Sequence, residues 1–486
     1  MGSAINPGIA GAGNVGAEDR LEYTVIGDGV NIVARLEEFS RGFGNINEAN
    51  PSGIRNAVLV EVRLPVQLQG KWERVKIYAL GGNRKVTVGR SKAMRRAFKG
   101  KVWAGMGLLL LCGLAGGGRV PEVQVVESDF HRRPLRDPKR PGYQHLSKDV
   151  RVDTGACAYA LRYCVSVPPD RQDRVEPVEG YIGMPGPSSE NWYHSGFLFL
   201  DLNGRDLGTT PLESMRVTET GRRAIVDYVW DAPEARVRVR FLARAGDTKL
   251  FTEIAWEPKV ALQSVRLRLT CYPSFFTAWH RREGNRTVQT PAHTFHQGET
   301  ADLDPQQDWW LVYYDTVFDP ARGEGRGPCA LLFRPEEIAG GQVKVGSYPV
   351  HTTLTVRPEV RWVHLLFWDF TGRDNETALA QMRRYAEENR RQLAACDFLN
   401  RRVREFDLSA ARAEVEELLS AAAGTEKFAE QLGGLHRRLG ELLSALRPPS
   451  PEKGPSPIRA EEEFLRRLAE REELLWELKF HVLLHD

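Results

Sequence analysis

Apolar and polar residues alternate with a period of two through much of the region 119–372, as expected for β-strands with one buried face. The segments that show it most clearly are RVRVRF (236–241), SVRLRL (264–269) and TTLTVR (352–357). In each, basic or hydroxyl side chains would line one face and apolar side chains the other. Two aromatic runs, 309–314 and 362–368, predict more fully buried strands. Glycine, proline, asparagine and aspartate separate these runs, so we predict a large antiparallel β-sandwich.

The region 373–447 changes to the three-to-four-residue spacing of amphipathic helices. A proline-rich linker follows at 448–458, and a charged helix is predicted over 459–486 with Phe464 and Leu468 on its apolar stripe. Such helices pack on their own domain or associate as a coiled coil. Their charge runs are interpreted as solvated faces.

A different pattern opens the chain. Glycines in 11–16 predict a turn region, 21–26 predicts a strand, and 30–39 predicts a short amphipathic helix. Asn31 and Arg35 lie one helical turn apart on the polar face of this helix. An amide and a guanidinium at that spacing can hold a sugar phosphate and neutralise charge on a transferring phosphoryl group.

The stretch AGNVGAEDRLEYTVIGDGVNIVARLE (12–37) resembles the C-terminal half of the catalytic domain of class III adenylate/guanylate cyclases. INPG (5–8) and LQGKWERVKIYAL (68–80) resemble the end of the preceding strand and the closing hairpin of that domain. The resemblance implies that Asn31 orients the ribose, Arg35 stabilises the pentavalent phosphate and Thr24 contacts the base of ATP. The resemblance covers residues 1–82.

The cyclase family binds two metal ions through aspartates in the N-terminal half of its domain, which lies before the matching segment. Asp19 and Asp28 occupy neither position. Two-metal phosphoryl transfer needs carboxylate ligands, so the resemblance implies a chain that is inactive alone and binds no cofactor. Mg or Mn with ATP would bind only if a partner half, or a second copy, supplied the ligands. A rival interpretation takes the glycines of 11–16 as a dinucleotide fingerprint, but they lead into a strand rather than a helix.

Residues 83–101 carry eight lysines or arginines and no acid, and the uncharged run 102–118 follows. A basic flank before a short apolar run is the layout of a secretory signal or membrane anchor. The positive-inside rule then predicts a membrane-associated chain with a cytoplasmic N-terminus and an exported C-terminal region. Alternatively, a start at Met94 would make this stretch a signal peptide, and cleavage near 112–118 would give a secreted or periplasmic protein.

Aromatic and polar residues gather in one part of the predicted sandwich: Trp279, His280 and Arg282, followed by His293 and His296. Rings that stack on a pyranose face, with charged groups that bind its hydroxyls, line sugar-binding clefts. In general outline the region is similar to the carbohydrate-associated supersandwich class, which implies a glycan as ligand. The His-x-x-His spacing also fits a metal pair, but histidines that only hydrogen-bond are commoner in loops, so we assign no metal ligands.

Composition narrows the alternatives. The 67 basic and 64 acidic residues leave a net charge of +3, which gives no basis for nucleic-acid binding. The six cysteines match no zinc pattern; Cys157 and Cys164 are a weak disulfide candidate, and buried free thiols are the expected state.

Together these features predict a multidomain α+β chain with a truncated cyclase-like α/β module (1–82), a β-sandwich (119–372) and a C-terminal α-helical tail. One hypothesis is a membrane-associated protein with an incomplete cyclase module that is related to cyclic nucleotide signalling and inactive alone. The alternative is an exported carbohydrate-binding or carbohydrate-active β-sandwich protein with an incidental N-terminal segment.

Overall fold

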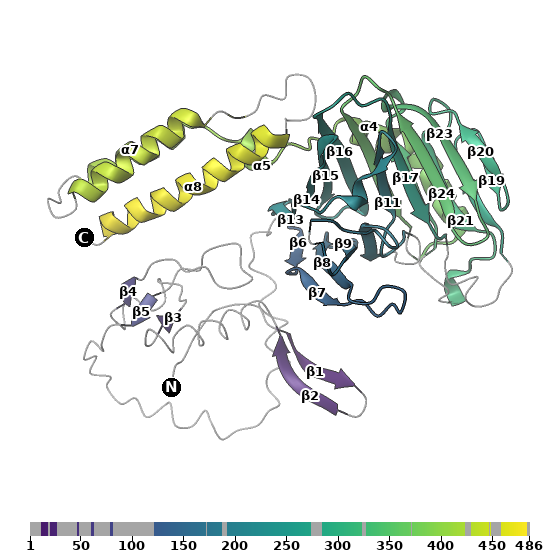
Figure 1. The fold of residues 1–486 in the computed structure, drawn as a ribbon, viewed down its shortest axis with the longest axis horizontal. Coiled ribbons are helices and arrows are strands. Elements are labelled where there is room, and N and C mark those ends of the chain that lie inside the picture. Colours follow the sequence, from purple (N-terminus) through teal and green to yellow (C-terminus); the bar gives the residue numbers. More distant parts are fainter. Residues whose placement is uncertain are drawn as a thin grey trace, which may run out of the picture. The chain divides into compact units, whose positions relative to one another are not determined.

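The computed structural model describes residues 121–486 except 172, 187–191, 274–283, 323–326, 371, 423–428, 447, 449–457 and 484–486. Of residues 1–120 it describes five short strands. The chain divides into two compact units, residues 1–118 and 119–486 (Figure 1).

In the first unit, β1 (Gly11–Ala17) and β2 (Arg20–Ile26) form an antiparallel hairpin. The strand predicted over 21–26 is therefore confirmed. The turn predicted over 11–16 is wrong, because these glycines pair along β2, with Gly13 opposite Thr24. Glycine tolerates extended backbone, and the ladder uses only backbone groups.

Three further strands of this unit, β3 (Ile46–Asn47), β5 (Tyr78–Leu80) and β4 (Val60–Val62), form a small sheet in that order. The helix predicted over 30–39, with Asn31 and Arg35, lies outside the described residues.

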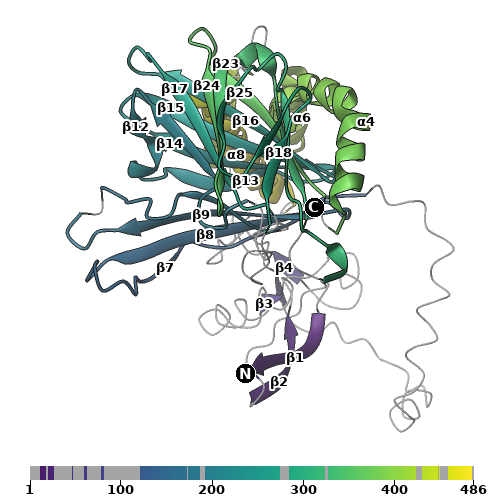
Figure 2. The same cartoon turned by 90° about the vertical axis from the view of Figure 1, so that its right-hand side faces the viewer.

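The second unit contains two large antiparallel sheets (Figures 1 and 2). The order in the eleven-stranded sheet is β20 (Thr300–Leu303), β23 (Ile338–Val345), β24 (Val350–Val356), β17 (Val265–Cys271), β11 (Leu198–Leu202), β10 (Ile182–Gly186), β9 (Ala158–Val167), β8 (Gln144–Asp153) and β6 (Gln124–Glu127), with β12 (Arg205–Asp206) beside β11 and β7 (His131–Pro134) beside β8. The order in the nine-stranded sheet is β13 (Ser214–Glu219), β14 (Arg223–Asp231), β15 (Ala235–Arg244), β16 (Lys249–Pro258), β25 (Trp362–Asp369), β22 (Cys329–Phe333), β21 (Trp310–Asp315), β18 (Arg286–Gln289) and β19 (Thr294–His296). Short 3-10 turns occupy η2 (Leu207–Thr209), η3 (Pro320–Arg322) and η4 (Pro335–Glu337).

One apolar core lies between the sheets and includes side chains of both, among them Leu267, Val239 and Leu366. All five segments predicted as strands in this region fall on strands: β15, β17, β24, β21 and β25. The predicted large antiparallel β-sandwich is therefore confirmed.

The polar faces of two strands have different environments. On β17, Arg266 and Arg268 are exposed while the alternate residues are buried, as the period of two predicts. On β15, Arg236, Arg238 and Arg240 are buried as well. The predicted alternation of basic and apolar faces is present on both strands, but the basic face of β17 is exposed and that of β15 is buried, because another element covers β15.

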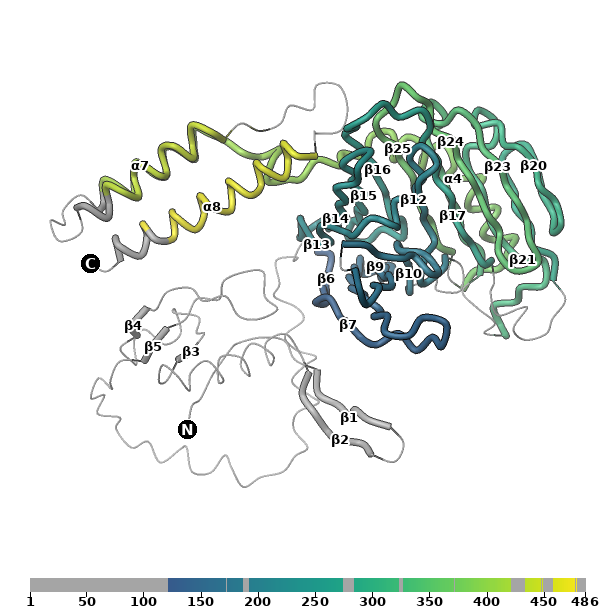
Figure 3. Tube along the Cα trace, viewed as in Figure 1, coloured from purple at the N-terminus to yellow at the C-terminus, as the bar shows by residue number. Residues whose placement is uncertain are grey.

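That element is α8 (Ile458–Leu483), which contacts β15 and β16 of the nine-stranded sheet, whereas α4 (Asn375–Ala394) contacts β21, β22 and β25. The helices α5 (Arg401–Arg404), α6 (Leu408–Ala422) and α7 (Ala429–Ala445) complete the tail. Figure 3 shows α7 running beside α8. The tail has its own apolar core, with Leu439, Leu443, Leu468 and Leu478 buried in it. Helices are thus present where the spacing predicted them.

Among the described helices, every one is too short or too polar to cross a membrane. The apolar segment predicted to act as a signal or anchor, residues 102–118, lies outside the described part of the chain.

Candidate functional site

Two glycines set the geometry at one end of the eleven-stranded sheet. A Cβ added to Gly180 would lie 2.3 Å from the Cα of Gly196, and one added to Gly183 would lie 1.9 Å from the carbonyl oxygen of His194. The chain before β11 therefore crosses β10 with backbone touching backbone, which only glycine permits. The φ of Gly180, +149°, also disfavours other residues. This crossing places Glu179 beside the segment that carries Tyr193 and His194.

Three tyrosines meet there, and we call Tyr193, Tyr272 and Tyr348 the tyrosine cluster. The ring centroids of Tyr193 and Tyr272 are 5.1 Å apart, and those of Tyr272 and Tyr348 are 4.7 Å apart. The His194 ring lies 4.8 Å from that of Tyr193. Tyr348 is 47% exposed, and the other two are half-buried. Loops before β11, after β17 and before β24 thus supply an aromatic surface that is accessible to solvent.

Glu179 is the electrostatic centre of this surface, because its carboxylate is exposed and its charge acts on Tyr193, Tyr272 and His194. Burial, together with the charge of Glu179, raises the pKa of Tyr193, and burial raises the pKa of Tyr272 to about 12. Burial lowers the pKa of His194, helped by the charge of Arg162 and opposed by that of Glu179. At neutral pH Tyr193 and Tyr272 are therefore protonated phenols and His194 is a neutral imidazole.

A cavity of about 260 Å³ has Glu179 in its lining. The rest of its polar lining comes from Asp137, His145 on β8, Ser166 on β9 and Ser195. A neighbouring hollow of about 540 Å³ shares His145. Burial and the charges of nearby arginines lower the pKa of His145. The tyrosine cluster and the cavity together combine aromatic faces with hydroxyl, imidazole and carboxylate groups.

A row of side chains, most of them polar, crosses the eleven-stranded sheet. The strand register places Phe199, Arg268, Thr353 and Gln342 in one row across four strands. The Arg268 guanidinium lies 3.9 Å above the Phe199 ring centre. Helices α4 and α8 both pack on the other, nine-stranded sheet.

The structure distributes the candidate residues from the sequence differently. Trp279, His280 and Arg282 lie outside the described residues. His293 is in the turn between β18 and β19, and its Nδ1 is 2.8 Å from Asp308 Oδ1, which also accepts a hydrogen bond from Thr290. His296 ends β19 and is exposed. Both histidines belong to the nine-stranded sheet, whereas the tyrosine cluster lies beside strands of the other sheet. In the described part of the chain, no three His, Cys, Asp or Glu side chains gather to hold a metal ion.

Sequence reasoning missed the tyrosine cluster and Glu179. One signal was present, because Trp192-Tyr193-His194 is an aromatic and imidazole run of the same kind as the one at 279–280. The other tyrosines stand alone in the sequence, at 272 and 348, and only the fold brings them together.

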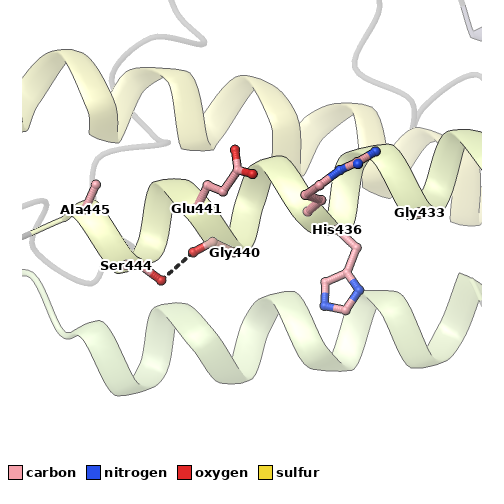
Figure 4. Close-up of a pocket in the computed structure, with 7 residues that line it drawn as sticks. Gly433, His436, Gly440, Glu441, Ser444 and Ala445 are labelled. Atoms are coloured by element: carbon pink, nitrogen blue, oxygen red, sulfur yellow. Dashed lines mark hydrogen bonds between the residues drawn. The ribbon is translucent and has the colours of Figure 1, made fainter.

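Two other hollows have different characters. One, of about 770 Å³, follows a single helix, α7, over Gly433, Gly440 and Ser444 (Figure 4). The Ser444 hydroxyl donates to the Gly440 carbonyl of the same helix, at 2.8 Å. With one helix as its lining, this is a shallow surface groove, and its polar groups do not converge.

The second hollow, of about 660 Å³, lies between β13 to β15 and the first turns of α8, and charged residues line it. Arg238 bonds Glu461 of α8 at 2.7 Å and Glu253 of β16 at 2.9 Å. Arg240 bonds Asp227 at 2.6 Å and pairs with Glu461 at 3.0 Å. Because these charges satisfy one another, we interpret them as the attachment of α8 to the sheet.

In comparisons with known proteins, no family model and no curated protein matches the chain. Solved structures that resemble it include an α-galactosidase from Geobacillus stearothermophilus, with 11% identity over 46% of this chain and 40% of that one at a TM-score of 0.25. An α-N-acetylgalactosaminidase from Bifidobacterium bifidum has 10% identity over 60% of this chain and 42% of that one, with a TM-score of 0.31. An α-mannosidase from Enterococcus faecalis has 8% identity over 56% and 40%, with a TM-score of 0.30. The chain spans about two fifths of the length of these structures.

These findings correct the cyclase interpretation. No cyclase family model matches residues 1–82, and the three solved structures named above are glycoside hydrolases. The assignments of a nucleotide cyclase activity and of a role in cyclic nucleotide signalling are therefore wrong. The nucleotide roles given to Thr24, Asn31 and Arg35 depended on that resemblance and have no other support.

Proposed function

We propose that the second unit is a carbohydrate-binding β-sandwich and that the tyrosine cluster contacts the sugar. The observation that carries this proposal is the partly exposed set of three tyrosine rings around a carboxylate. A pyranose has apolar C–H faces and a rim of hydroxyls, so an aromatic face stacks on it while polar groups bind the rim. Tyr348 supplies the most exposed ring, and Glu179 and His194 supply acceptors and a donor.

A glycan array, followed by titration calorimetry with the best glycan, tests this proposal on the full chain. Tyr348→Ala is expected to weaken binding about tenfold, since losing one aromatic contact costs about 0.5–1.5 kcal/mol beyond its area. The matched control is Tyr385→Ala on α4, where another partly exposed tyrosine (37%) lies outside the cluster. Unchanged affinity for Tyr348→Ala, or an array with no bound glycan, would refute the proposal.

We propose as well that this unit is exported. The support is the sequence pattern alone, a basic flank at 83–101 before the apolar run 102–118. N-terminal sequencing of the protein isolated from its cells is expected to give a mature start near Gly116. An intact Met1 on the isolated chain would contradict export by cleavage.

A further inference from the structure

Two cysteines from opposite sheets touch inside the sandwich. Cys271 is the last residue of β17 and Cys329 is the first residue of β22. Their sulfur atoms are 3.5 Å apart, and the residues are 1% and 0% exposed. Both thiols are free in this structure. They lie in van der Waals contact across the interface between the sheets.

We propose that Cys271 and Cys329 form a disulfide that cross-links the two sheets when the chain folds in an oxidising environment. A disulfide needs the two sulfurs at about 2.05 Å and the Cβ atoms about 3.5–4.5 Å apart. Closing the remaining gap of roughly 1.5 Å takes side-chain rotation and a small shift of the strand ends. Both cysteines stand at ends of strands, where such a shift is easiest.

The neighbouring backbone holds the pair in register. Cys271 forms a β-bridge with Trp192, and Cys329 pairs with Tyr313 on one side and with Asp369 on the other. Each thiol therefore projects from a strand with paired neighbours, so the contact follows from the packing of the two sheets.

The reaction is a thiol–disulfide exchange with an oxidant that is itself a disulfide, such as oxidised glutathione or a dithiol oxidoreductase. One cysteine thiolate attacks the oxidant, a mixed disulfide forms, and the second thiolate displaces the reduced oxidant. The two thiols lose two protons and two electrons, and the oxidant disulfide gains them to become two thiols. Burial raises the pKa of Cys329 far above its usual value, so the bridge forms during folding, as the sheets come together and the oxidant still reaches the thiols.

The other described cysteines cannot take this role. Cys157 and Cys164 are seven residues apart along extended backbone at β9, a separation of about 23 Å at roughly 3.3 Å per residue. This spacing rules out the disulfide candidate from the sequence, because bridged Cα atoms lie within about 7 Å of each other. Cys396 accepts a hydrogen bond from Arg244. Cys271 and Cys329 are the described pair in sulfur–sulfur contact.

Peptide mapping of the full chain tests the proposal. The reduced protein is refolded in a buffer of oxidised and reduced glutathione, quenched in acid and alkylated under denaturing conditions without reductant. We expect a linked peptide pair that contains Cys271 and Cys329, with Cys157, Cys164 and Cys396 alkylated. Alkylation of both Cys271 and Cys329, or linkage of either one to a different cysteine, would overturn the proposal.

A second measurement compares the Tm of the wild-type chain in its oxidised and reduced forms. The oxidised chain is expected to lose several degrees of Tm when it is unfolded and refolded in excess reductant, because the bridge closes a loop of 58 residues. Cys271→Ser is expected to have the lower Tm in both buffers. Equal Tm values for the wild-type chain in the two buffers would count against the cross-link. Neither readout depends on glycan binding, so this proposal and the proposed function can fail separately.

Discussion

Replacing Glu461 by glutamine tests whether α8 is attached through buried charge. The Glu461 carboxylate lies between Arg238 and Arg240, at 2.7 and 3.0 Å. All three side chains are 1 or 2% exposed. Glutamine keeps the size of the side chain and one acceptor oxygen, but it removes the charge and places an amide NH₂ near two guanidinium groups.

The expected cost is about 3 kcal/mol of unfolding free energy. Removing one partner of a buried ion pair costs about 3–5 kcal/mol, because the remaining charge stays buried without compensation. The lower end applies here, since Arg238 keeps Glu253 at 2.9 Å and Arg240 keeps Asp227 at 2.6 Å. A loss of this size is a large part of the roughly 5–15 kcal/mol that stabilises a typical domain.

Urea unfolding followed by tryptophan fluorescence measures the global change, and hydrogen exchange locates it. We expect faster amide exchange over α8, with the central strands β15 and β16 still protected. Glu463→Gln is the matched control on the same helix. Glu463 is 41% exposed and pairs with Arg466 and Arg467 at the surface, so its loss should cost less than about 1 kcal/mol.

The reasoning fails if Glu461→Gln and Glu463→Gln have the same small effect on stability. That result would mean that the buried arginines find other compensation, and that apolar packing alone attaches α8.

Two further predictions concern pH and backbone contact. Although burial opposes it, hydrogen bonds to Glu253 and Glu337 raise the pKa of His364 to about 9. The folded pKa exceeds the unfolded value of about 6.5, so protonated His364 contributes its full stabilisation below about pH 6.5. This contribution, up to about 3 kcal/mol of unfolding free energy, is lost as the pH rises through about 9. If His364→Gln showed the same dependence of unfolding free energy on pH as the wild-type chain, the prediction would be contradicted. Gly196→Ala should lower the unfolding free energy measured in urea by about 3 kcal/mol, because the added Cβ would lie 2.3 Å from the Gly180 Cα. The control, Gly434→Ala, lies in open space on α7 and should stabilise its helix by about 1 kcal/mol. Equal effects of the two glycine changes would contradict the backbone crossing.

The period of two located the strands because it depends only on which residues face the core. It could not tell β15 from β17, since both read as arginine alternating with valine or leucine. The two strands differ in what their arginines contact. On β15, Arg238 binds Glu461, which is 223 residues away in the sequence and so is invisible to a local pattern. Reading the charge run at 461–463 as a solvated face was therefore wrong for Glu461, which is 1% exposed.

The candidate site was harder to predict for a related reason. Sequence reasoning sought residues that are close along the chain and selected His293 and His296 in one hairpin. The tyrosine cluster joins positions 193, 272 and 348, which come together only through the strand order of the eleven-stranded sheet. A glycine pair with touching backbones, 180 and 196, completes the geometry, and no local pattern marks such a pair.

The helices α5 to α8 keep an apolar core separate from that of the sandwich, and α8 meets the sheet through arginine and carboxylate groups, whereas α4 packs apolar side chains into the sandwich core. Release of α8 from the sheet would therefore expose charge to water, and the sandwich and the helices would each keep a closed apolar core. Solubility then does not depend on the docking of α8, so selection can alter or lengthen this part of the tail with little risk of aggregation.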